Sequence, residues 1–191
     1  MNGNPEIAKK LYASFCKGVA PSLELTDEIN EAVRFFFINR CSFSGISEAG
    51  GFSPRSSTHR FTKSAIERLF ALPPLLSGVT VTNNDIFDIW DKFPANSYVY
   101  FDPPYGNASK LYGKNGELHS FDHARFARLL TESRDKFHFL VTYNAEMVEI
   151  FPSYKQFTVV PWNQQYAMNS FNSPSARVGK EVLIFNYASI A

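Results

Sequence analysis

The chain has 191 residues with 45% apolar content, enough to bury a core. Its formal net charge of +1 argues against a strongly basic coat for nucleic acid but not against a local basic groove. Its two cysteines, Cys16 and Cys41, lack CxxC spacing and cannot build a disulfide framework or a zinc site, so we expect free thiols and no metal. No apolar run reaches the roughly 18–20 residues that span a bilayer, and the N-terminus lacks a signal-peptide pattern, so we expect a cytoplasmic protein without a membrane partner.

Helices separated by loops are predicted in the first part of the chain. Pro5 suits the first turn of a helix, and Thr26 or Asp27 can cap the helix that follows. A later helix is expected to stop at Pro73-Pro74, because proline in a helix interior removes a hydrogen bond. The three helices are predicted over residues 5–17, 27–40 and 62–72.

Residues 41–61 differ from their neighbours, because Ser and Gly are frequent. A stretch of this length without regular structure is usually functional or mobile, so we expect a long irregular loop. Its basic side chains can contact phosphates or guanine edges, although a solvated surface loop explains them too. These side chains belong to Arg55, His59, Arg60 and, just beyond the loop, Lys63.

The pattern changes at residue 79, after which β-branched and aromatic runs alternate with helical segments. Strands are predicted over residues 79–82, 97–101, 138–143, 155–161 and 181–187. Helices are predicted over residues 84–90, 145–151 and 121–136, the last with Ser120 as its cap. The alternation favours a mainly parallel sheet covered by helices, with the last two strands antiparallel. Trp90 and Trp162 are expected to be packing residues.

The tetrapeptide Asp102-Pro103-Pro104-Tyr105 directly follows the strand predicted over 97–101. In open α/β sheets, ligands bind outside the carboxyl ends of the strands. The Asp102 carboxylate and the Pro103 carbonyl can each accept a hydrogen bond from an amine conjugated to a ring, which aims its lone pair at an electrophile. Tyr105 can stack on that ring, and a nucleotide base would have to leave its helix to reach such a pocket. The structural alternative is a simple turn with Tyr105 in the core.

With its neighbours, this tetrapeptide resembles the Dam-like class of DNA adenine-N6 methyltransferases. The similar segments follow the order of the family: an aromatic helix with a turn, an acidic segment near the cofactor, the tetrapeptide, a substrate-side loop and a last strand. Besides the tetrapeptide, they are Phe36-Phe37-Ile38-Asn39-Arg40 with Phe43-Ser44-Gly45, Asn84-Asp85-Ile86-Phe87, residues 111–119 with Phe121-Asp122-His123, and residues 179–187. Ser44 departs from the asparagine that is usual in the family.

The resemblance implies an enzyme that transfers a methyl group from S-adenosylmethionine to N6 of a flipped adenine in double-stranded DNA. Aspartate at position 102 favours an adenine or cytosine amine, because enzymes that methylate protein glutamine usually carry asparagine there. The implied residues are Asp102, Pro103, Pro104 and Tyr105 for catalysis, Asp85, Ile86 and Asp102 for the cofactor, and Asn39, Arg40, Arg55, His59, Arg60, Lys63, Lys110, Tyr112 and Lys114 for DNA.

The implied fold is α/β, a Rossmann-like S-adenosylmethionine-dependent methyltransferase sheet with a helical and loop target-recognition insertion. Residues 1–78 would form the target-recognition region, and residues 79–191 the C-terminal part of the catalytic domain. The opening strand, Phe-x-Gly-x-Gly loop and second strand of the family are absent from the sequence, so we expect an N-terminally truncated sheet. We further expect weak binding of S-adenosylmethionine by this chain alone. Its open sheet edges would be closed by direct pairing, by self-association or by a separate N-terminal fragment.

Two other functions stay open on the sequence. The first is a non-catalytic remnant or DNA-binding module, of phage origin for example, which the absent glycine loop favours. The second is an RNA adenine methyltransferase. A methyl-transfer assay on unmethylated duplex DNA, with and without an added N-terminal fragment, tests the first alternative. A comparison of DNA with RNA substrates in the same assay tests the second.

Overall fold

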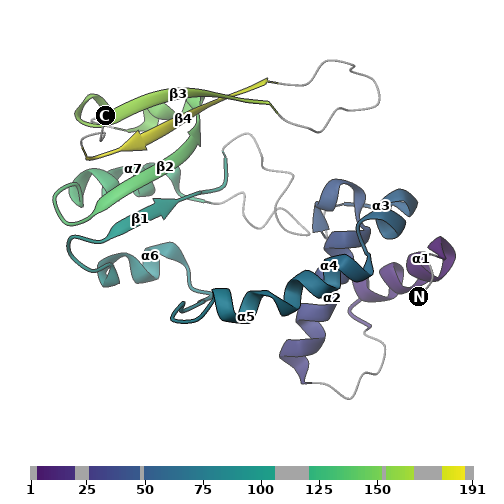
Figure 1. Cartoon of the computed structure of the whole chain (residues 1–191). Coiled ribbons are helices and arrows are strands. Elements are labelled where there is room, and N and C mark those ends of the chain that lie inside the picture. The colour runs from purple at the N-terminus through teal and green to yellow at the C-terminus, as the bar shows by residue number, and fades with distance from the viewer. Residues whose placement is uncertain are drawn as a thin grey trace. The chain divides into compact units, whose positions relative to one another are not determined.

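The computed structural model describes residues 4–19, 26–47, 50–105, 121–151, 154–165 and 178–187. The described residues form two compact units, the first ending at Val81 and the second beginning at Thr82 (Figure 1). Each unit buries its own cluster of apolar side chains. The first core lies between helices, and the second is built on a sheet.

The first unit is helical. It contains α1 (Pro5–Cys16), α2 (Asp27–Cys41), the 3-10 turn η1 (Phe43–Gly45), α3 (Pro54–His59), α4 (Lys63–Phe70) and α5 (Leu72–Leu75). Thr26 caps α2 as predicted, because its hydroxyl accepts a hydrogen bond from the backbone N–H of Ile29. The buried core of α1 and α2 consists of Tyr12, Phe15, Phe37, Ile38 and Cys41.

Two sequence-based expectations for this unit are wrong. Residues 41–61 are not one irregular loop, because Ser53 caps the short helix α3 by accepting a hydrogen bond from the Ser56 N–H. Helix α4 ends before the position expected, and Pro73 and Pro74 lie within α5. Proline is tolerated in a first helical turn, where its absent N–H would have no helical partner.

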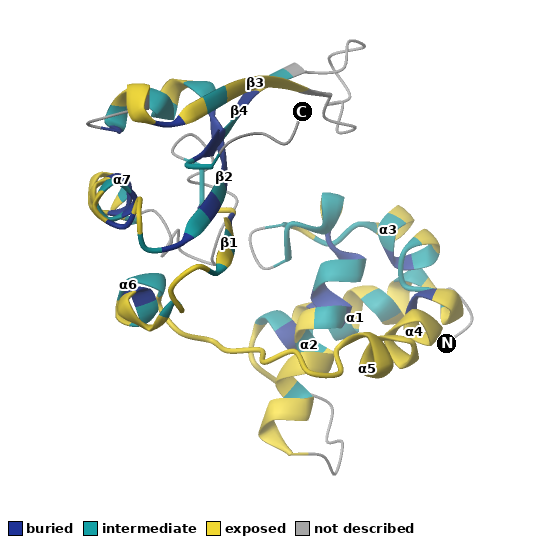
Figure 2. Ribbon diagram, turned by 60° about the vertical axis from the view of Figure 1, so that its left-hand side comes forward, coloured by how far each residue is buried: buried dark blue, intermediate teal, exposed yellow. Residues whose placement is uncertain are grey.

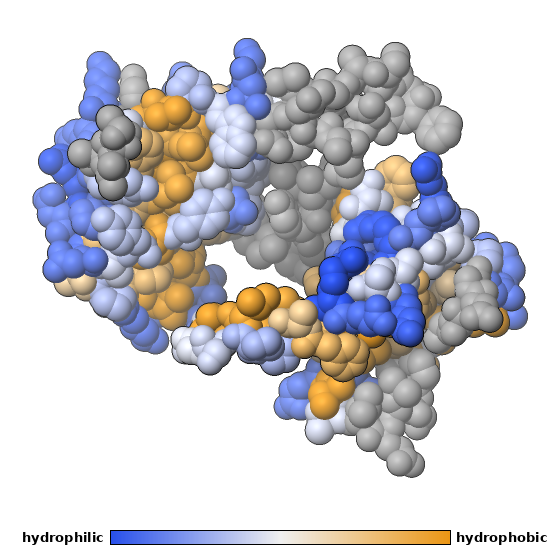
Figure 3. Space-filling view, viewed as in Figure 1, coloured by the Kyte–Doolittle hydropathy of each residue, from blue (hydrophilic) through white to orange (hydrophobic). Residues whose placement is uncertain are grey.

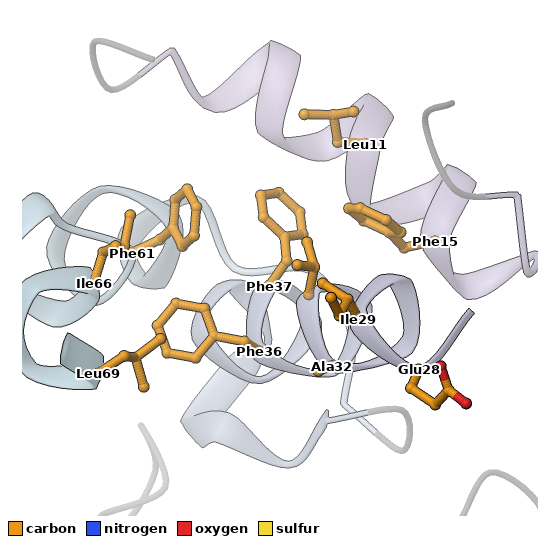
Figure 4. Close-up of a pocket in the computed structure, with 11 residues that line it drawn as sticks. Leu11, Phe15, Glu28, Ile29, Ala32, Phe36, Phe37, Phe61, Ile66 and Leu69 are labelled. Atoms are coloured by element: carbon orange, nitrogen blue, oxygen red, sulfur yellow. The ribbon is translucent and has the colours of Figure 1, made fainter. Parts of the chain in front are cut away.

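A largely apolar pocket of about 660 Å³ opens between α1, α2 and α4 with the residues just before it (Figure 4). Phe15, Phe36 and Phe61 are among the side chains that line it. Ile29 and Leu69 also line it and remain 48% and 41% exposed. The helices of the first unit therefore surround apolar space without filling it.

The second unit is built on a four-stranded sheet in the order β1-β2-β4-β3. Its elements are α6 (Ile86–Ile89), η3 (Trp90–Lys92), β1 (Tyr98–Phe101), α7 (His123–Glu132), β2 (His138–Asn144), η5 (Ala145–Ile150), η6 (Tyr154–Gln156), β3 (Thr158–Gln165) and β4 (Val178–Phe185). The antiparallel pairing of β3 with β4 confirms the prediction for the last two strands. The expected mainly parallel sheet is wrong, because of the three described pairs only β1 with β2 is parallel.

Two local expectations for the chain from residue 79 onward also differ from the structure. Residues 79–82 form no strand, and Val81 is 79% exposed. A strand needs a neighbour that takes its backbone N–H and C=O groups, and β-branched side chains do not supply one. Helix α7 is capped by Asp122, whose carboxylate accepts a hydrogen bond from the Arg125 N–H at 2.8 Å. The expected cap, Ser120, lies outside the described residues.

The two faces of the sheet have different surroundings. Helices α6 and α7 lie on the same side of it (Figure 2), and Phe139, Val141 and Tyr143 of β2 point into the core on that side. The alternating residues Tyr98 and Tyr100 of β1 are 75% and 61% exposed on the opposite face. Apolar side chains form a visible band over the sheet of this unit (Figure 3).

Trp90 lies at the centre of the second core. It is 3% exposed, and its indole N–H donates a hydrogen bond to the Ser133 hydroxyl at 2.9 Å. Its ring stacks on Phe101 with 5.4 Å between ring centroids. Phe101 is the last residue of β1, so this packing fixes the backbone immediately before Asp102.

Candidate active site and nucleic-acid interface

Asp102 is the first residue after β1, at the carboxyl end of the strand. Because β1 and β2 are parallel and Phe101 pairs with Val141, the next residues of both strands meet at one edge of the sheet. The Thr142 hydroxyl donates a hydrogen bond to Asp102 Oδ1 at 2.9 Å. Asp102 is otherwise exposed, so one carboxylate oxygen is anchored on β2 while the residue still reaches solvent.

Two tyrosines, Tyr100 and Tyr105, border this site. The Tyr100 hydroxyl lies 3.1 Å from Thr142 Oγ1. Burial raises the pKa of Tyr105 to about 12, and the nearby Glu181 carboxylate adds to the shift. Tyr105 is therefore a neutral, half-buried aromatic ring at neutral pH.

Tyr143 connects Tyr105 with helix α7. It is fully buried, its hydroxyl is hydrogen-bonded to His123 Nδ1, and its ring centroid lies 6.1 Å from that of Tyr105. Burial raises the pKa of Tyr143 and lowers the pKa of His123. Both groups are thus held in their neutral forms, as expected for a fully buried tyrosine beside a half-buried histidine.

The two further cofactor candidates, Asp85 and Ile86, begin helix α6. The Asp85 carboxylate accepts a hydrogen bond from the Phe87 N–H at 2.8 Å and caps the helix. Ile86 is half-buried and packs against the core of the second unit. A carboxylate has about four acceptor positions, so this cap leaves Asp85 able to accept from a ligand.

Three of the predicted DNA contacts have partners inside the first unit. The Asn39 side-chain N–H donates to the Gly45 carbonyl at 2.9 Å. The Arg40 guanidinium lies over the Phe36 ring, 5.4 Å from its centroid. Arg60 packs against Gly45, where an added Cβ would stand 2.6 Å from the guanidinium. These side chains shape the turn that follows α2.

Other predicted DNA contacts point outward. Arg55 and His59 are exposed on α3. Lys63 begins α4 with its side chain 91% exposed, 3.6 Å from Glu67, an ion pair that contributes little in water. The remaining three predicted residues, Lys110, Tyr112 and Lys114, lie outside the described residues.

Gly45→Ala is expected to lower the free energy of unfolding of the first unit by about 1–2 kcal/mol, since φ at this position is +76° and disfavours any side chain. The added Cβ would also displace Arg60. Urea denaturation followed by circular dichroism measures the loss. Gly51→Ala is the matched control, because no atom lies within 4 Å of its added Cβ. Equal losses in the two variants would contradict the prediction.

Thr142, Tyr143 and Asn144 were not expected from the sequence to belong to the site. The sequence feature that could have identified them is the run of polar residues at the carboxyl end of the apolar strand β2. In a parallel sheet, this end of β2 lies beside the carboxyl end of β1, where ligands bind. Asn144 is 6% exposed, and its Oδ1 is buried without a hydrogen-bond partner among the described residues. Such an acceptor is suited to a donor from a ligand.

No described helix is long and apolar enough to cross a membrane. The described side chains contain no group of three or more His, Cys, Asp or Glu residues arranged to hold a metal ion.

Comparison with known proteins agrees with the chemistry of this site. The chain matches the family of D12 class N6 adenine-specific DNA methyltransferases over residues 17–168, and a search of the curated proteins finds no match. The matched range covers more than half of the chain and includes the Asp102–Tyr105 tetrapeptide, which confirms the resemblance to DNA adenine-N6 methyltransferases. The chain therefore belongs to the D12 class N6 adenine-specific DNA methyltransferases, enzymes that methylate adenine N6 in DNA with S-adenosylmethionine as the donor.

Proposed function

We propose that this chain holds a flipped DNA adenine at the carboxyl end of β1 and presents its N6 amine for methylation. The observation that carries the proposal is the Asp102 carboxylate, anchored through one oxygen by Thr142 at 2.9 Å and followed by Pro103 and Pro104. The second Asp102 oxygen and the Pro103 carbonyl accept the two N6 hydrogens. This localises the lone pair on N6 and stabilises the positive charge that develops there.

Tyr105 is the proposed stacking partner of the adenine ring. Its own ring is half-buried and supported by Tyr143, whose hydroxyl is tied to His123 on α7. A supported aromatic face holds the base in line at a low entropic cost, which favours reaction through orientation. Such a base must first leave the DNA stack.

The described residues are better suited to bind adenine, which accepts the methyl group, than to bind S-adenosylmethionine, which donates it. S-adenosylmethionine supplies the methyl group when it is bound. We propose that Asp85 and Ile86 of this chain contact the cofactor adenine and that Asp102 borders the transferred methyl group. Because Asp85 also caps α6 and Ile86 also packs in the core, these two residues alone make a small binding surface. Weak cofactor binding by the isolated chain is therefore expected.

We propose that a further strand pairs with the outer edge of β1, as part of a Rossmann-like sheet. Among the described strands, β1 pairs with β2 alone. Its residues are uncharged, and exposed Tyr98 and Tyr100 give it none of the protection that lysine or proline usually provides at a sheet edge. A second copy or a separate polypeptide can supply this strand, which would bring cofactor-binding groups next to Asp102.

The central test is transfer of a labelled methyl group from S-adenosylmethionine to unmethylated double-stranded DNA, with N6-methyladenine as the expected product. The chain is assayed alone and with an added polypeptide that carries the Phe-x-Gly-x-Gly segment of the family. Activity that requires the addition supports completion of the sheet by a partner. Absence of activity in both conditions contradicts the catalytic proposal and favours a DNA-binding remnant. RNA of the same sequence is expected to be a poor substrate, and calorimetry that shows micromolar cofactor binding by the chain alone would contradict the expected weakness.

We also propose that the first unit is the target-recognition region and the second unit the catalytic region. Arg55 and His59 on α3, with Lys63 at the start of α4, present positive or polar groups to solvent. Such groups suit DNA phosphates, whose contacts fix the register of a protein on the duplex. Asn39, Arg40 and Arg60 would act by shaping the turn behind them.

Arg55→Ala is expected to weaken binding to double-stranded DNA by about 3- to 10-fold and to reduce the salt dependence by about one counterion. The variant makes one phosphate contact fewer, so its binding releases fewer of the counterions that are condensed on the DNA. Fluorescence anisotropy at several salt concentrations gives both quantities. Arg128→Ala is the control. Arg128 is an exposed arginine on α7, 3.9 Å from Glu132. The same loss in both variants would reflect net charge only and would contradict a contact by α3.

A further inference from the structure

We infer that Thr142 is a positioning residue for methyl transfer: it sets the orientation of the Asp102 carboxylate from one point on β2. The inference rests on the proposed function of Asp102. The Thr142 hydroxyl lies 2.9 Å from Asp102 Oδ1. The first residue of the tetrapeptide is thereby tied to the neighbouring strand.

The hydrogen-bonding capacity of the hydroxyl decides the direction of each bond. A threonine hydroxyl has one proton and two acceptor lone pairs, whereas an ionised carboxylate can only accept. The single Thr142 proton therefore goes to Asp102 Oδ1. The Tyr100 hydroxyl, 3.1 Å away, then donates to Thr142. The Thr142 hydroxyl is thus held by a donor on one side and by the Asp102 carboxylate on the other.

Thr142 is the rigid member of this set. It lies within β2, where its backbone pairs with Leu183 of β4, and it is 8% exposed. A β-branched side chain in a strand has restricted rotation about χ1. Asp102, in contrast, is exposed and follows the last residue of β1. The strand therefore holds the threonine, and the threonine holds the carboxylate.

The two carboxylate oxygens of Asp102 therefore have different hydrogen-bond partners. Oδ1 faces Thr142, and Oδ2 is left to accept a hydrogen from the adenine amine. Without the Thr142 hydroxyl, the carboxylate rotates among several conformers, and only some of them place an oxygen against the amine. Misorientation of this kind lowers the rate of the bound complex more than its affinity for DNA.

Thr142→Val removes the hydroxyl and preserves the branched shape. We expect kcat for methyl transfer to fall about 10- to 100-fold, the loss typical of a hydrogen bond to a charged group. The KM for DNA should stay within about threefold, because no DNA contact is removed. Thr142→Ser should restore most of the rate. The assay uses whichever condition makes the unaltered protein active, with its partner polypeptide where that is required.

Thr131→Val is the matched control, since it removes a hydroxyl that donates to the Ala127 carbonyl at 2.9 Å within α7. It should keep the normal kcat. A purely structural role for Thr142 would appear as an equal loss in Thr142→Ser and Thr142→Val, or as a change in KM with kcat kept. Either result would overturn the inference.

A second measurement separates this inference from the proposed function. Three-bond couplings to the Asp102 Cγ, measured by NMR in solution, report whether its χ1 occupies one rotamer. We expect one rotamer in the unaltered protein and in Thr131→Val, and averaging in Thr142→Val. If no protein form transfers methyl groups but the averaging is seen, the positioning stands and the proposed function fails. A single unchanged rotamer in Thr142→Val would show that Thr142 does not orient Asp102.

Discussion

Asp102→Ala is expected to lower kcat for methyl transfer by about 10³-fold or more. The substitution removes the acceptor for one N6 hydrogen and the negative charge beside the reacting nitrogen. Loss of one such stabilising group typically costs about 10²- to 10³-fold, and Asp102 supplies two effects at once. The labelled methyl-transfer assay on unmethylated double-stranded DNA measures the loss.

Asp135→Ala is the control for net charge. Asp135 lies in the turn before β2 with its side chain 95% exposed, far along the chain from the tetrapeptide. It should leave kcat unchanged. DNA binding by Asp102→Ala should also stay close to normal, because the proposed role of Asp102 is in the reaction. If Asp102→Ala retained more than about a tenth of the activity, another residue would have to hold the amine.

Trp90→Ala is expected to lower the free energy of unfolding of the second unit by about 3–5 kcal/mol, the usual range for removal of a large buried ring. Trp90 is 3% exposed and stacks on Phe101, and its indole N–H bonds to Ser133 at 2.9 Å. The variant loses apolar burial and leaves a cavity beside β1. Urea denaturation followed by circular dichroism measures the change without relying on tryptophan fluorescence.

Trp162→Ala provides the comparison within the same unit. Trp162 is on β3 and is 45% exposed, so its removal should cost less than about 1.5 kcal/mol. Both tryptophans were expected from the sequence to be packing residues, but only Trp90 has the buried surroundings of a core side chain. Similar losses in the two variants would show that Trp162 is covered in solution, for example by a partner on that face.

Local chemistry explains the features that were predictable from the sequence. Thr26 begins α2 and Asp85 begins α6 because each side chain satisfies a backbone N–H within its own segment. The short apolar run before Asp102 forms β1 because a buried partner strand follows later in the chain. The tetrapeptide likewise carries its chemistry in consecutive residues, and it led to the family that the comparison confirms.

Non-local contacts explain the expectations that were wrong. Residues 79–82 have the composition of a strand but no described neighbour, and they remain exposed. Pro73 and Pro74 lie within a helix because a first turn tolerates them, which depends on where the preceding helix ends. In both cases the outcome depended on pairing or position, which composition does not encode.

The sequence by itself determined which chemical groups the chain brings to an adenine: a carboxylate, a proline carbonyl and an aromatic ring in one short segment. Only the tertiary structure decided how those groups are held. Thr142 is 40 residues from Asp102 in the chain, and the two meet because β1 and β2 are parallel neighbours in register. Hydrogen bonds between distant residues depend on strand order, and strand order results from packing of the whole unit.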